Sequence, residues 1–343
     1  MSGPPPFPTA PPPRLLRVAP AETAGAIGGG LRNGALVAPA PSAVVELLGP
    51  GAVPCFQGLL TNDIEAPGDG AFVYGALLTP KGMIVAEGWA ARNGPSVRFT
   101  VPVEGHEATL ALLARSVPPR LARTVDRTRD LAVLRVVGPH AAGVVQRSGL
   151  PVPPAAGRIA VTDDEVEVAR APEGAPFAFQ VTAAAAVVQE IGQRLERSGA
   201  LVAGPAVLEL SRIVAGWPRL AAEVDLKTIP QEVRFDEIGG VSYTKGCYTG
   251  QETVSRLHFR GHTNRELRGL EFAGEPPDRD PLSVVFEDRE VGRVTSLAHL
   301  PDAGWIGLAV LRREVSPGAV VRVADAAARV VMLPFSLVRP RPA

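Results

Sequence analysis

The chain has 343 residues, more than one ordinary core requires, so we expect two or three domains. Its 35 basic and 35 acidic residues give zero formal net charge, which argues against direct DNA binding. Any RNA would have to bind to a local patch of basic residues. Cys55 and Cys247 lie far apart and match neither a disulfide framework nor a zinc pattern. Without an apolar run of bilayer length or a secretory signal, we expect a cytoplasmic protein with no membrane contact.

The N-terminal half begins with a proline-rich stretch, residues 1–14, that predicts a disordered tail. Apolar segments separated by the turn sequences "TPKG" and "RNGP" then predict a meander of strands, and a helical apolar stripe and a buried strand follow. The predicted strands cover 71–79, 83–91 and 96–101, the helix 104–115 and the last strand 131–138.

A second run of alternating helices and strands follows, and after residue 262 the predicted elements are short strands alone. The second run is predicted as helices over 139–147, 183–198 and 205–216, with strands over 165–170, 177–182 and 201–202. Such alternation is typical of an α+β fold with two lobes, which we place at residues 15–262. Several short strands with Gly-, Pro- and Asp-rich turns predict a β-barrel or sandwich over 263–343.

The segment "KGCYTGQE", residues 245–252, contains residue types that are rare elsewhere in the chain. It holds one of the two cysteines and one of only three lysines. Gly246 and Gly250 favour tight turns and close backbone approach, so we expect a loop that enters a helix over 251–258. The order of residues differs from a Walker A loop, and ATP binding is therefore not implied.

Cys247 is the candidate reactive group in this segment. Lys245 and the following helix start would favour its thiolate. The alternative is a small buried hydrophobic residue, which is what most free cysteines are. His258 could serve as a base only if the fold brought it back from the far end of the helix. Other polar groups have plainer explanations, since Asn62 and Asp63 fit a capping turn, and Glu209 with the segment 212–225 fits a helix end and a solvated loop.

The stretch "GGVSYTKGCYTGQETVSRLHFRG" resembles the signature of the YgfZ family, folate-binding relatives of the glycine-cleavage T-protein, whose hallmark is K-G-C-[FY]-x-G-Q-E. The stretches "FQGLLTNDI", "YGALLTPKGMIV" and "SRIVAGWPR" are similar to the family in the same order. The resemblance implies two α+β lobes and a C-terminal β-barrel around a central cavity that binds tetrahydrofolate or another reduced folate.

The resemblance also implies roles for individual residues. Cys247 and Lys245 would be the functional pair, with Lys245 lowering the pKa of the thiol and no resident metal required. The residues implied to contact folate or shape its site are Gly246, Tyr248, Gly250, Gln251, Glu252 and Arg256. In that interpretation Gln251 and Glu252 hold the loop by hydrogen bonds, and Tyr248 packs at the mouth of the cavity.

Two departures separate the chain from the aminomethyltransferase branch. The paired aspartates of that branch correspond to Ala86 and Glu87, and its folate-contacting glutamate corresponds to Val214. Because Val214 cannot make the charge-assisted hydrogen bonds of a carboxylate, we do not expect a classical aminomethyltransferase. The expected function is support of iron–sulfur cluster assembly or repair, with iron–sulfur apoproteins or assembly factors as partners and indirect effects on tRNA modification. A folate-dependent aminomethyl- or methyltransferase using Glu87, and a non-catalytic docking scaffold, are the alternatives.

Overall fold

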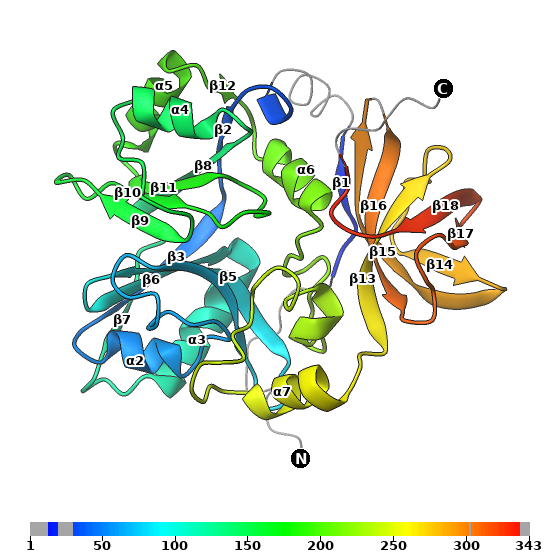
Figure 1. Ribbon diagram of the computed structural model, residues 1–343, viewed down its shortest axis with the longest axis horizontal. Helices are drawn as coiled ribbons and strands as arrows, with labels where there is room; N and C mark the ends of the chain where they lie inside the picture. The colour runs from blue at the N-terminus through cyan, green and yellow to red at the C-terminus, as the bar shows by residue number, and fades with distance from the viewer. Residues whose placement is uncertain (1–12, 20–29, 302, 337–343) are drawn as a thin grey trace.

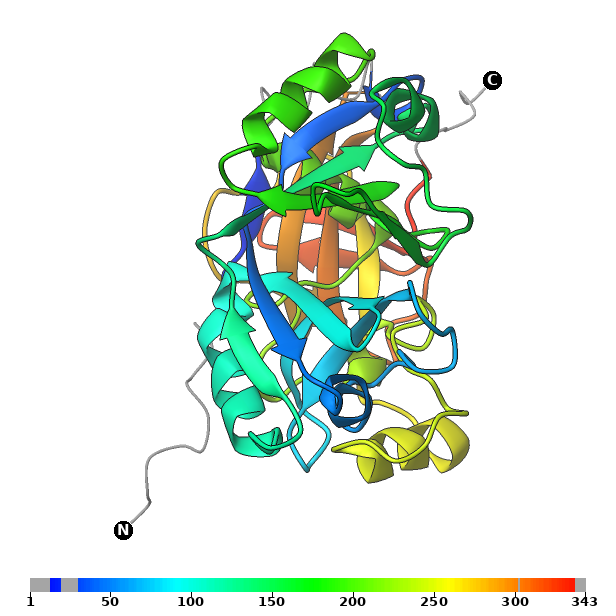
Figure 2. The same ribbon diagram turned by 90° about the vertical axis from the view of Figure 1, so that its left-hand side faces the viewer.

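The computed structural model of the chain describes residues 13–19, 30–301 and 303–336, and contains three sheets. Two of them form separate α+β lobes, and the third forms a barrel beside both lobes (Figure 1). Seen from the side, the two lobes lie one above the other with the barrel behind them (Figure 2). The expected α+β class with two lobes and a C-terminal barrel is confirmed.

The first lobe is a five-stranded antiparallel sheet covered by helices α2 (Ala52–Gln57) and α3 (His106–Ser116). Apolar side chains of the sheet and both helices form one buried core, in which the Phe56 and Phe99 rings meet edge to face at 5.2 Å. The predicted strands and helix of this region are confirmed. The strand order is β4 (Phe72–Leu78), β5 (Ile84–Asn93), β6 (Ser96–Pro102), β3 (Ser42–Leu48) and β7 (Arg123–Asp126).

The second lobe is a six-stranded mixed sheet packed against α4 (Ala141–Arg147) and α5 (Val188–Arg197). The helix predicted from residue 183 begins only at Val188, because Ala183 and Ala184 complete a strand that pairs with its neighbour. Tertiary pairing there overrides the helix propensity of the alanine run. The strand order is β12 (Leu201–Val202), β2 (Leu36–Pro39), β8 (Leu131–Val137), β11 (Phe179–Ala184), β10 (Glu167–Arg170) and β9 (Arg158–Val161).

The third sheet closes on itself as a six-stranded barrel. An additional short strand, β1 (Leu16–Val18), pairs in parallel with β15 of this barrel, whereas these residues were expected to belong to the two lobes. A three-residue strand is too short to carry a periodic signal. The barrel strands are β13 (Arg265–Phe272), β14 (Leu282–Phe286), β15 (Arg289–Leu300), β16 (Gly304–Arg312), β17 (Val320–Val323) and β18 (Ala326–Val331).

The predicted N-terminal tail lies almost wholly outside the described residues, which begin at Pro13. Within them, the backbone N–H of Arg14 donates to the carbonyl of Ala221 at 2.9 Å, so the chain is held at that residue. None of the helices in the described ranges is long and apolar enough to cross a membrane.

Three further segments connect the lobes to the barrel. Helix α6 (Ala206–Ala215) lies between the second lobe and the barrel, followed by the 3₁₀ turn η3 (Pro230–Val233) and by α7 (Gln251–Arg260) at the edge of the molecule (Figure 1). One apolar cluster includes side chains from both lobes, from α6 and from the barrel. The centre of the molecule is therefore a shared core.

Candidate functional site

The Lys245 side chain joins the glycine-rich loop to the first lobe. It is 7 % exposed, and its Nζ atom donates to the carbonyl oxygens of Gln57, Leu60 and Asn62 at 2.6, 2.7 and 2.8 Å. All three protons of the ammonium are thus used by the last residue of α2 and by the segment that follows it. Burial lowers the pKa of Lys245 to about 8, against the opposing effect of Asp63 and Glu65. The structure makes this lysine a clamp between loop and lobe.

The two glycines of the loop differ in their surroundings. Gly250 has φ +83° at the start of α7, and a Cβ there would lie 2.7 Å from the carbonyl oxygen of Thr79. Gly82, in the facing turn of the "TPKG" hairpin, has φ +85°, and its Cβ would lie 2.9 Å from that of Thr253. Glycine is therefore required at both positions by backbone conformation and close packing. By contrast, a Cβ on Gly246 would meet nothing within 4 Å.

Tyr248 and Cys247 are adjacent in sequence but differ in exposure. Tyr248 is 6 % exposed, with the Lys245 Nζ atom 5.2 Å from its ring centroid. Its buried hydroxyl has no hydrogen-bond partner among the described residues, and burial together with the charge of Asp236 raises its pKa. Cys247 is exposed. The alternative that Cys247 is a buried core residue is therefore wrong.

The remaining predicted residues of the segment lie on α7. The backbone N–H of Gln251 donates to the carbonyl of Tyr248 at 3.1 Å. The expected loop-holding hydrogen bonds from the side chains of Gln251 and Glu252 are not found within the described ranges, where α7 starts without a side-chain cap. Glu252 and Arg256 face solvent. Helix α7 is instead anchored by the packing of Gly250 and Thr253 on the hairpin.

A cavity of about 140 Å³ lies between the two lobes and α6. Its aromatic walls are Tyr74, Trp89, Phe177 and Trp217, and the Trp89 and Trp217 rings stack at 5.8 Å with an interplanar angle of 16°. A second cavity of about 250 Å³ shares Tyr74, Trp89 and Trp217 with the first. The three rings therefore form a partition between two adjoining spaces.

Titratable groups line the first cavity. Glu87 is 4 % exposed, and its carboxylate accepts hydrogen bonds from the Tyr74 hydroxyl at 3.0 Å and from the Leu220 N–H at 3.1 Å. Burial raises the pKa of Glu87 despite these bonds. The Arg135 guanidinium lies 4.3 Å from the Phe177 ring centroid, and donates to Gln180 at 3.2 and 3.3 Å. Burial lowers the pKa of Arg135 to about 10.

An ion-pair network closes the barrel side of the cavity. Arg212 pairs with Glu209 and with Glu223, each at 2.8 Å, and Arg219 pairs with Glu209 at 2.6 Å. The Glu223 carboxylate also accepts from Ser296 of the barrel at 2.6 Å. The plain interpretation of Glu209 and the segment 212–225 as a solvated loop is wrong, because these charges are matched inside the molecule.

A chain of hydrogen bonds connects the loop to the first cavity. Lys245 donates to the backbone of Asn62, and the Asn62 side-chain amide donates to the Tyr74 carbonyl at 2.7 Å. The Tyr74 hydroxyl in turn reaches Glu87. Asn62 also lines the second cavity, so it does more than cap a turn. None of the predicted residues between 245 and 256 lines either cavity.

Sequence reasoning missed most of the cavity walls. Tyr74, Trp89, Phe177 and Arg135 were read only as parts of strands or their flanks. A usable signal was present, since only 5 % of the residues are aromatic and yet Phe72, Tyr74 and Trp89 fall in one predicted hairpin. In the described ranges, no group of three or more His, Cys, Asp or Glu side chains is arranged to hold a metal ion.

Comparisons with known proteins agree with this architecture. Residues 39–151 match the family model of the GCVT N-terminal domain. The solved structure of the glycine cleavage system aminomethyltransferase T from Bartonella henselae superimposes with a TM-score of 0.77 at 18 % identity, covering 90 % of this chain and 88 % of that one. At that identity the likeness establishes the fold.

Sequence relatives are more specific. The tRNA-modifying protein YgfZ of Serratia proteamaculans (strain 568) is 30 % identical over 305 residues, which span 86 % of this chain and 90 % of the relative. The protein of the same name from Klebsiella pneumoniae (strain 342) is 34 % identical over 131 residues, 36 % of this chain and 40 % of that protein. The chain belongs to the YgfZ family.

Proposed function

We propose that this chain is a cytoplasmic protein that binds tetrahydrofolate or another reduced folate and supports iron–sulfur cluster assembly or repair. Effects on tRNA modification would then be indirect, through iron–sulfur enzymes that modify tRNA. The observation that supports this proposal most is the cavity between the lobes, with its aromatic walls and its buried acidic and basic groups. The T-protein-like fold and the YgfZ relatives support it further.

The chemistry of the cavity walls fits a reduced folate. Flat aromatic rings suit a planar heterocycle. The Trp217 Nε1 atom is buried without a hydrogen-bond partner among the described residues, so it is available as a donor to a ligand. Arg135 supplies a cation that contacts Gln180 and the Phe177 ring, and Glu87 supplies a carboxyl group. Each of these groups would recognise a ligand that carries carbonyl, amine and carboxylate groups.

The size of the cavities adds a requirement. Drug-sized ligands occupy roughly 300–1,000 Å³, whereas the two spaces here measure about 140 and 250 Å³. A ligand as long as a folate would therefore extend across the partition of Tyr74, Trp89 and Trp217. We expect the two tryptophans to change their environment when the ligand binds.

The chain's own residues would bind and orient the folate rather than transfer its one-carbon unit. Glu87 is the single carboxylate where the aminomethyltransferases have a pair, and both of its oxygens already accept hydrogen bonds. Val214 is buried in the central core and contributes no charge to the cavity. A folate held without transfer chemistry is suited to a binding or sensing role.

Cys247 is the residue proposed to act on iron–sulfur clients. It is exposed on a loop that Lys245 and Gly250 fix to the first lobe. An exposed thiol on an anchored loop can be presented to a partner protein, either as a redox group or as a transient ligand. The hydrogen-bond chain from Lys245 through Asn62 to Tyr74 would link this loop to ligand binding.

Three experiments test the proposal and its aminomethyltransferase alternative. Titration calorimetry of the purified chain with tetrahydrofolate should give a saturable heat, and its absence with every reduced folate would reject folate binding. A deletion strain complemented with wild type should recover iron–sulfur enzyme activity. Release of methylenetetrahydrofolate from tetrahydrofolate and an aminomethyl donor would instead establish the aminomethyltransferase alternative.

A further inference from the structure

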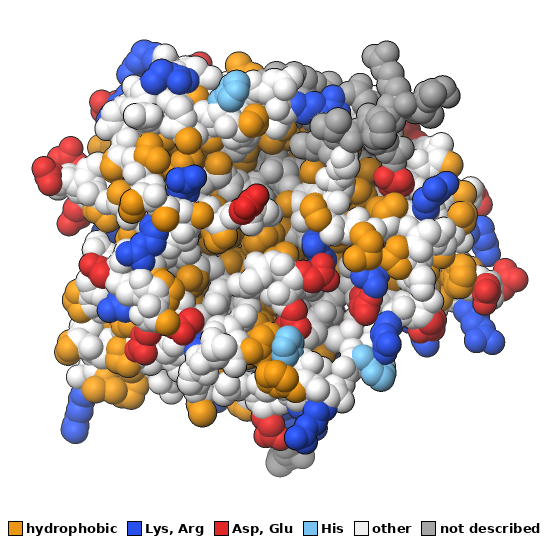
Figure 3. All heavy atoms as spheres, viewed as in Figure 1, with side chains coloured by type: hydrophobic (Ala, Val, Ile, Leu, Met, Phe, Trp, Pro, Cys, Tyr) orange, Lys and Arg blue, Asp and Glu red, His pale blue; other side chains and the backbone are white. Residues whose placement is uncertain are grey.

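The C-terminal half of α7 carries an unusual set of exposed side chains. We define the α7 patch as Tyr243, Arg256, His258, Phe259 and Arg260. Phe259 is 67 % exposed, the largest exposed fraction of any large hydrophobic side chain in the described residues. Figure 3 shows hydrophobic, histidine and basic side chains next to one another over this edge of the molecule, where Figure 1 places α7.

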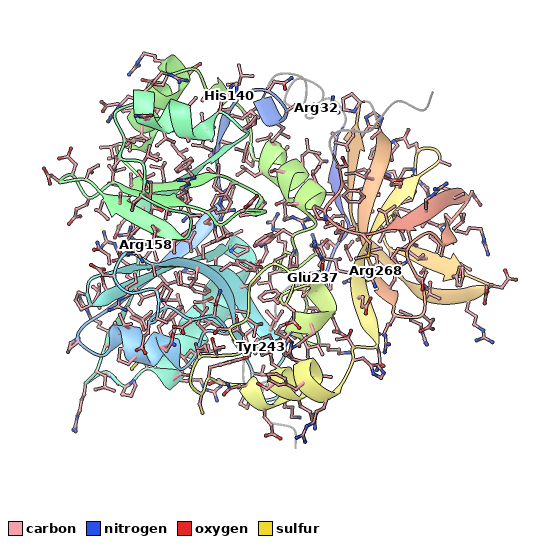
Figure 4. The ribbon with its side chains drawn as sticks, in the orientation of Figure 1. Arg32, His140, Arg158, Glu237, Tyr243 and Arg268 are labelled. Carbon is pink, nitrogen blue, oxygen red and sulfur yellow. The ribbon has the colours of Figure 1, made fainter. Side chains whose placement is uncertain are left out.

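The three rings of the α7 patch hold each other in place. The His258 ring stacks on Tyr243 with centroids 3.6 Å apart and an interplanar angle of 17°. Phe259 meets His258 edge to face at 4.8 Å and 88°, and meets Tyr243 at 5.9 Å and 74°. Tyr243, labelled in Figure 4, lies on the segment beside α7, so the rings come from two separate parts of the chain.

Polar groups beneath the rings fix their orientation. The Asp236 carboxylate accepts a hydrogen bond from the Tyr243 hydroxyl and lies 3.2 Å from Nδ1 of His258. The Gln231 amide donates to the Tyr243 hydroxyl at 3.1 Å. Two of the three rings are held in this way, and Phe259 packs edge to face against both of them.

Two arginines lie beside the rings, and the Asp236 carboxylate lies beneath them. Arg256 and Arg260 are four residues apart on α7 and therefore share one face of the helix. Both are exposed, and neither forms an ion pair with any part of the chain that the structure describes. The only acidic residue of α7, Glu252, lies in its first turn, away from Phe259. The C-terminal half of α7 thus presents two exposed arginines and one exposed aromatic ring, while the nearby Asp236 carboxylate is engaged by Tyr243 and His258.

We propose that the α7 patch binds single-stranded RNA, with a base stacked on Phe259 and phosphates at Arg256 and Arg260. Aromatic rings interleaved with arginines are the features that bind unpaired nucleotides. Arginine and aromatic residues are also enriched at protein–protein interfaces, so the comparison with duplex RNA and the salt dependence described below separate RNA from a protein partner. A duplex hides the faces of its bases, so we expect the unpaired form to bind more tightly.

This proposal is independent of the folate cavity. No residue of the α7 patch lines either of the two cavities between the lobes. Variants of the patch should therefore keep folate binding, and calorimetry with tetrahydrofolate on the same proteins separates a failure of one proposal from a failure of the other.

The test uses the full chain and a fluorescein-labelled RNA of mixed sequence, about 12 nucleotides long, followed by fluorescence anisotropy. Phe259→Ala should weaken binding roughly tenfold, the loss expected for one stacked base. Phe259→Trp should keep wild-type affinity, and Phe259→Leu should behave like the alanine variant, because leucine is apolar but cannot stack. Equal affinity of the leucine and wild-type proteins would overturn the stacking role.

The arginines are tested by salt dependence. Replacing both Arg256 and Arg260 with alanine should weaken RNA binding. The plot of log association constant against log salt should become less steep, by about 0.7 per lost phosphate contact. Arg120 and Arg123 are a matched control, since both are exposed and flank Leu121, an aliphatic residue that is 49 % exposed. The control double variant should bind RNA like wild type.

Three results would reject the proposal outright: no binding of the RNA, equal losses in the test and control double variants, or tighter binding of the matching RNA duplex. Near-ultraviolet circular dichroism of each variant establishes that the fold is retained. A protein that failed to bind RNA but gained a protein partner through Phe259 would reassign the patch to protein docking, and would overturn the RNA proposal.

Discussion

The Nζ atom of Lys245 lies 2.7 Å from the carbonyl oxygen of Leu60, a residue 185 positions earlier in the chain. This contact places a family-hallmark lysine against the segment that follows α2 in the first lobe. The same ammonium also binds the carbonyl of Gln57, the last residue of α2, and a carbonyl at a helix C-terminus lacks an intrahelical donor. The lysine is therefore explained by structure, independently of any effect on the neighbouring thiol.

Lys245→Met should destabilise the protein by about 3 kcal/mol, because three carbonyl oxygens lose their charged donor while the apolar stem of the side chain is retained. Urea unfolding followed by far-ultraviolet circular dichroism measures the change. The matched control is Lys227→Met at an exposed lysine, which should change the free energy of unfolding by less than about 0.5 kcal/mol. Equal stability of the two variants would contradict the clamp.

Gly250→Ala and Gly246→Ala form a second matched pair within the same loop. Gly250→Ala should cost at least about 1–2 kcal/mol of stability, because φ is +83° and the new Cβ would collide with the Thr79 carbonyl. Gly246→Ala meets nothing within 4 Å and should be close to neutral. Thermal melting of both variants decides the question, and a larger loss for Gly246→Ala would contradict the packing described for the loop.

The pH dependence of stability should report on Asp63. Burial, which raises the pKa of this carboxyl, is outweighed by hydrogen bonds from Ala66, Gln57 and Glu65 and by the charge of Lys245, so its pKa is lowered. A carboxyl with a lowered pKa stabilises the fold above its unfolded pKa and loses that contribution as the pH falls through its folded pKa. Asp63→Asn should therefore be less stable than wild type near pH 6, with the difference shrinking in acid. A constant difference from about pH 6 to about pH 3 would contradict this prediction.

The order of elements could be predicted from sequence wherever hydrophobic periodicity was strong. Apolar runs bounded by turn residues predict the hairpins at Gly82 and Asn93. A helical apolar pattern predicts helix α3. Strand β1 was not predicted, because its three residues gain their structure only by pairing with β15 at the other end of the sequence. Long-range pairing of this kind has no local signature.

The site was predicted only in part. The hallmark segment could be located, and its requirement for glycine at position 250 is explained by the structure. That this segment lies outside the cavity walls could not be predicted from sequence. The wall residues Arg135, Trp89 and Phe177 come from different segments and meet only when both lobes pack. Exposed arginine and phenylalanine on α7 also looked like ordinary solvent-facing residues, since the stacking of His258 on Tyr243 depends on a loop that crosses beside the helix.

Tryptophan fluorescence should detect ligand entry into the central cavities. Trp89 and Trp217 line both spaces, whereas Trp305 lies on barrel strand β16. Tetrahydrofolate should quench the emission of the wild type, and Trp217→Phe should reduce both the quenching and the affinity because the unpaired indole N–H is removed. Trp305→Phe is the control and should leave the ligand-dependent change intact. A Trp217→Phe protein with unaltered affinity would place the ligand elsewhere.

The two cysteines offer an internal comparison for the proposed thiol function. Cys247 is exposed, while Cys55 is half-buried on α2 against the core of the first lobe. Iodoacetamide should therefore modify Cys247 first, as peptide mass spectrometry can follow. Because no core packing is lost, Cys247→Ala should leave the melting temperature nearly unchanged and yet fail to restore iron–sulfur enzyme activity in the deletion strain. Cys55→Ala is the converse control, expected to lower stability modestly and to complement. A Cys247→Ala protein that complements fully would leave the loop a structural element anchored by Lys245, with no role for the sulfur.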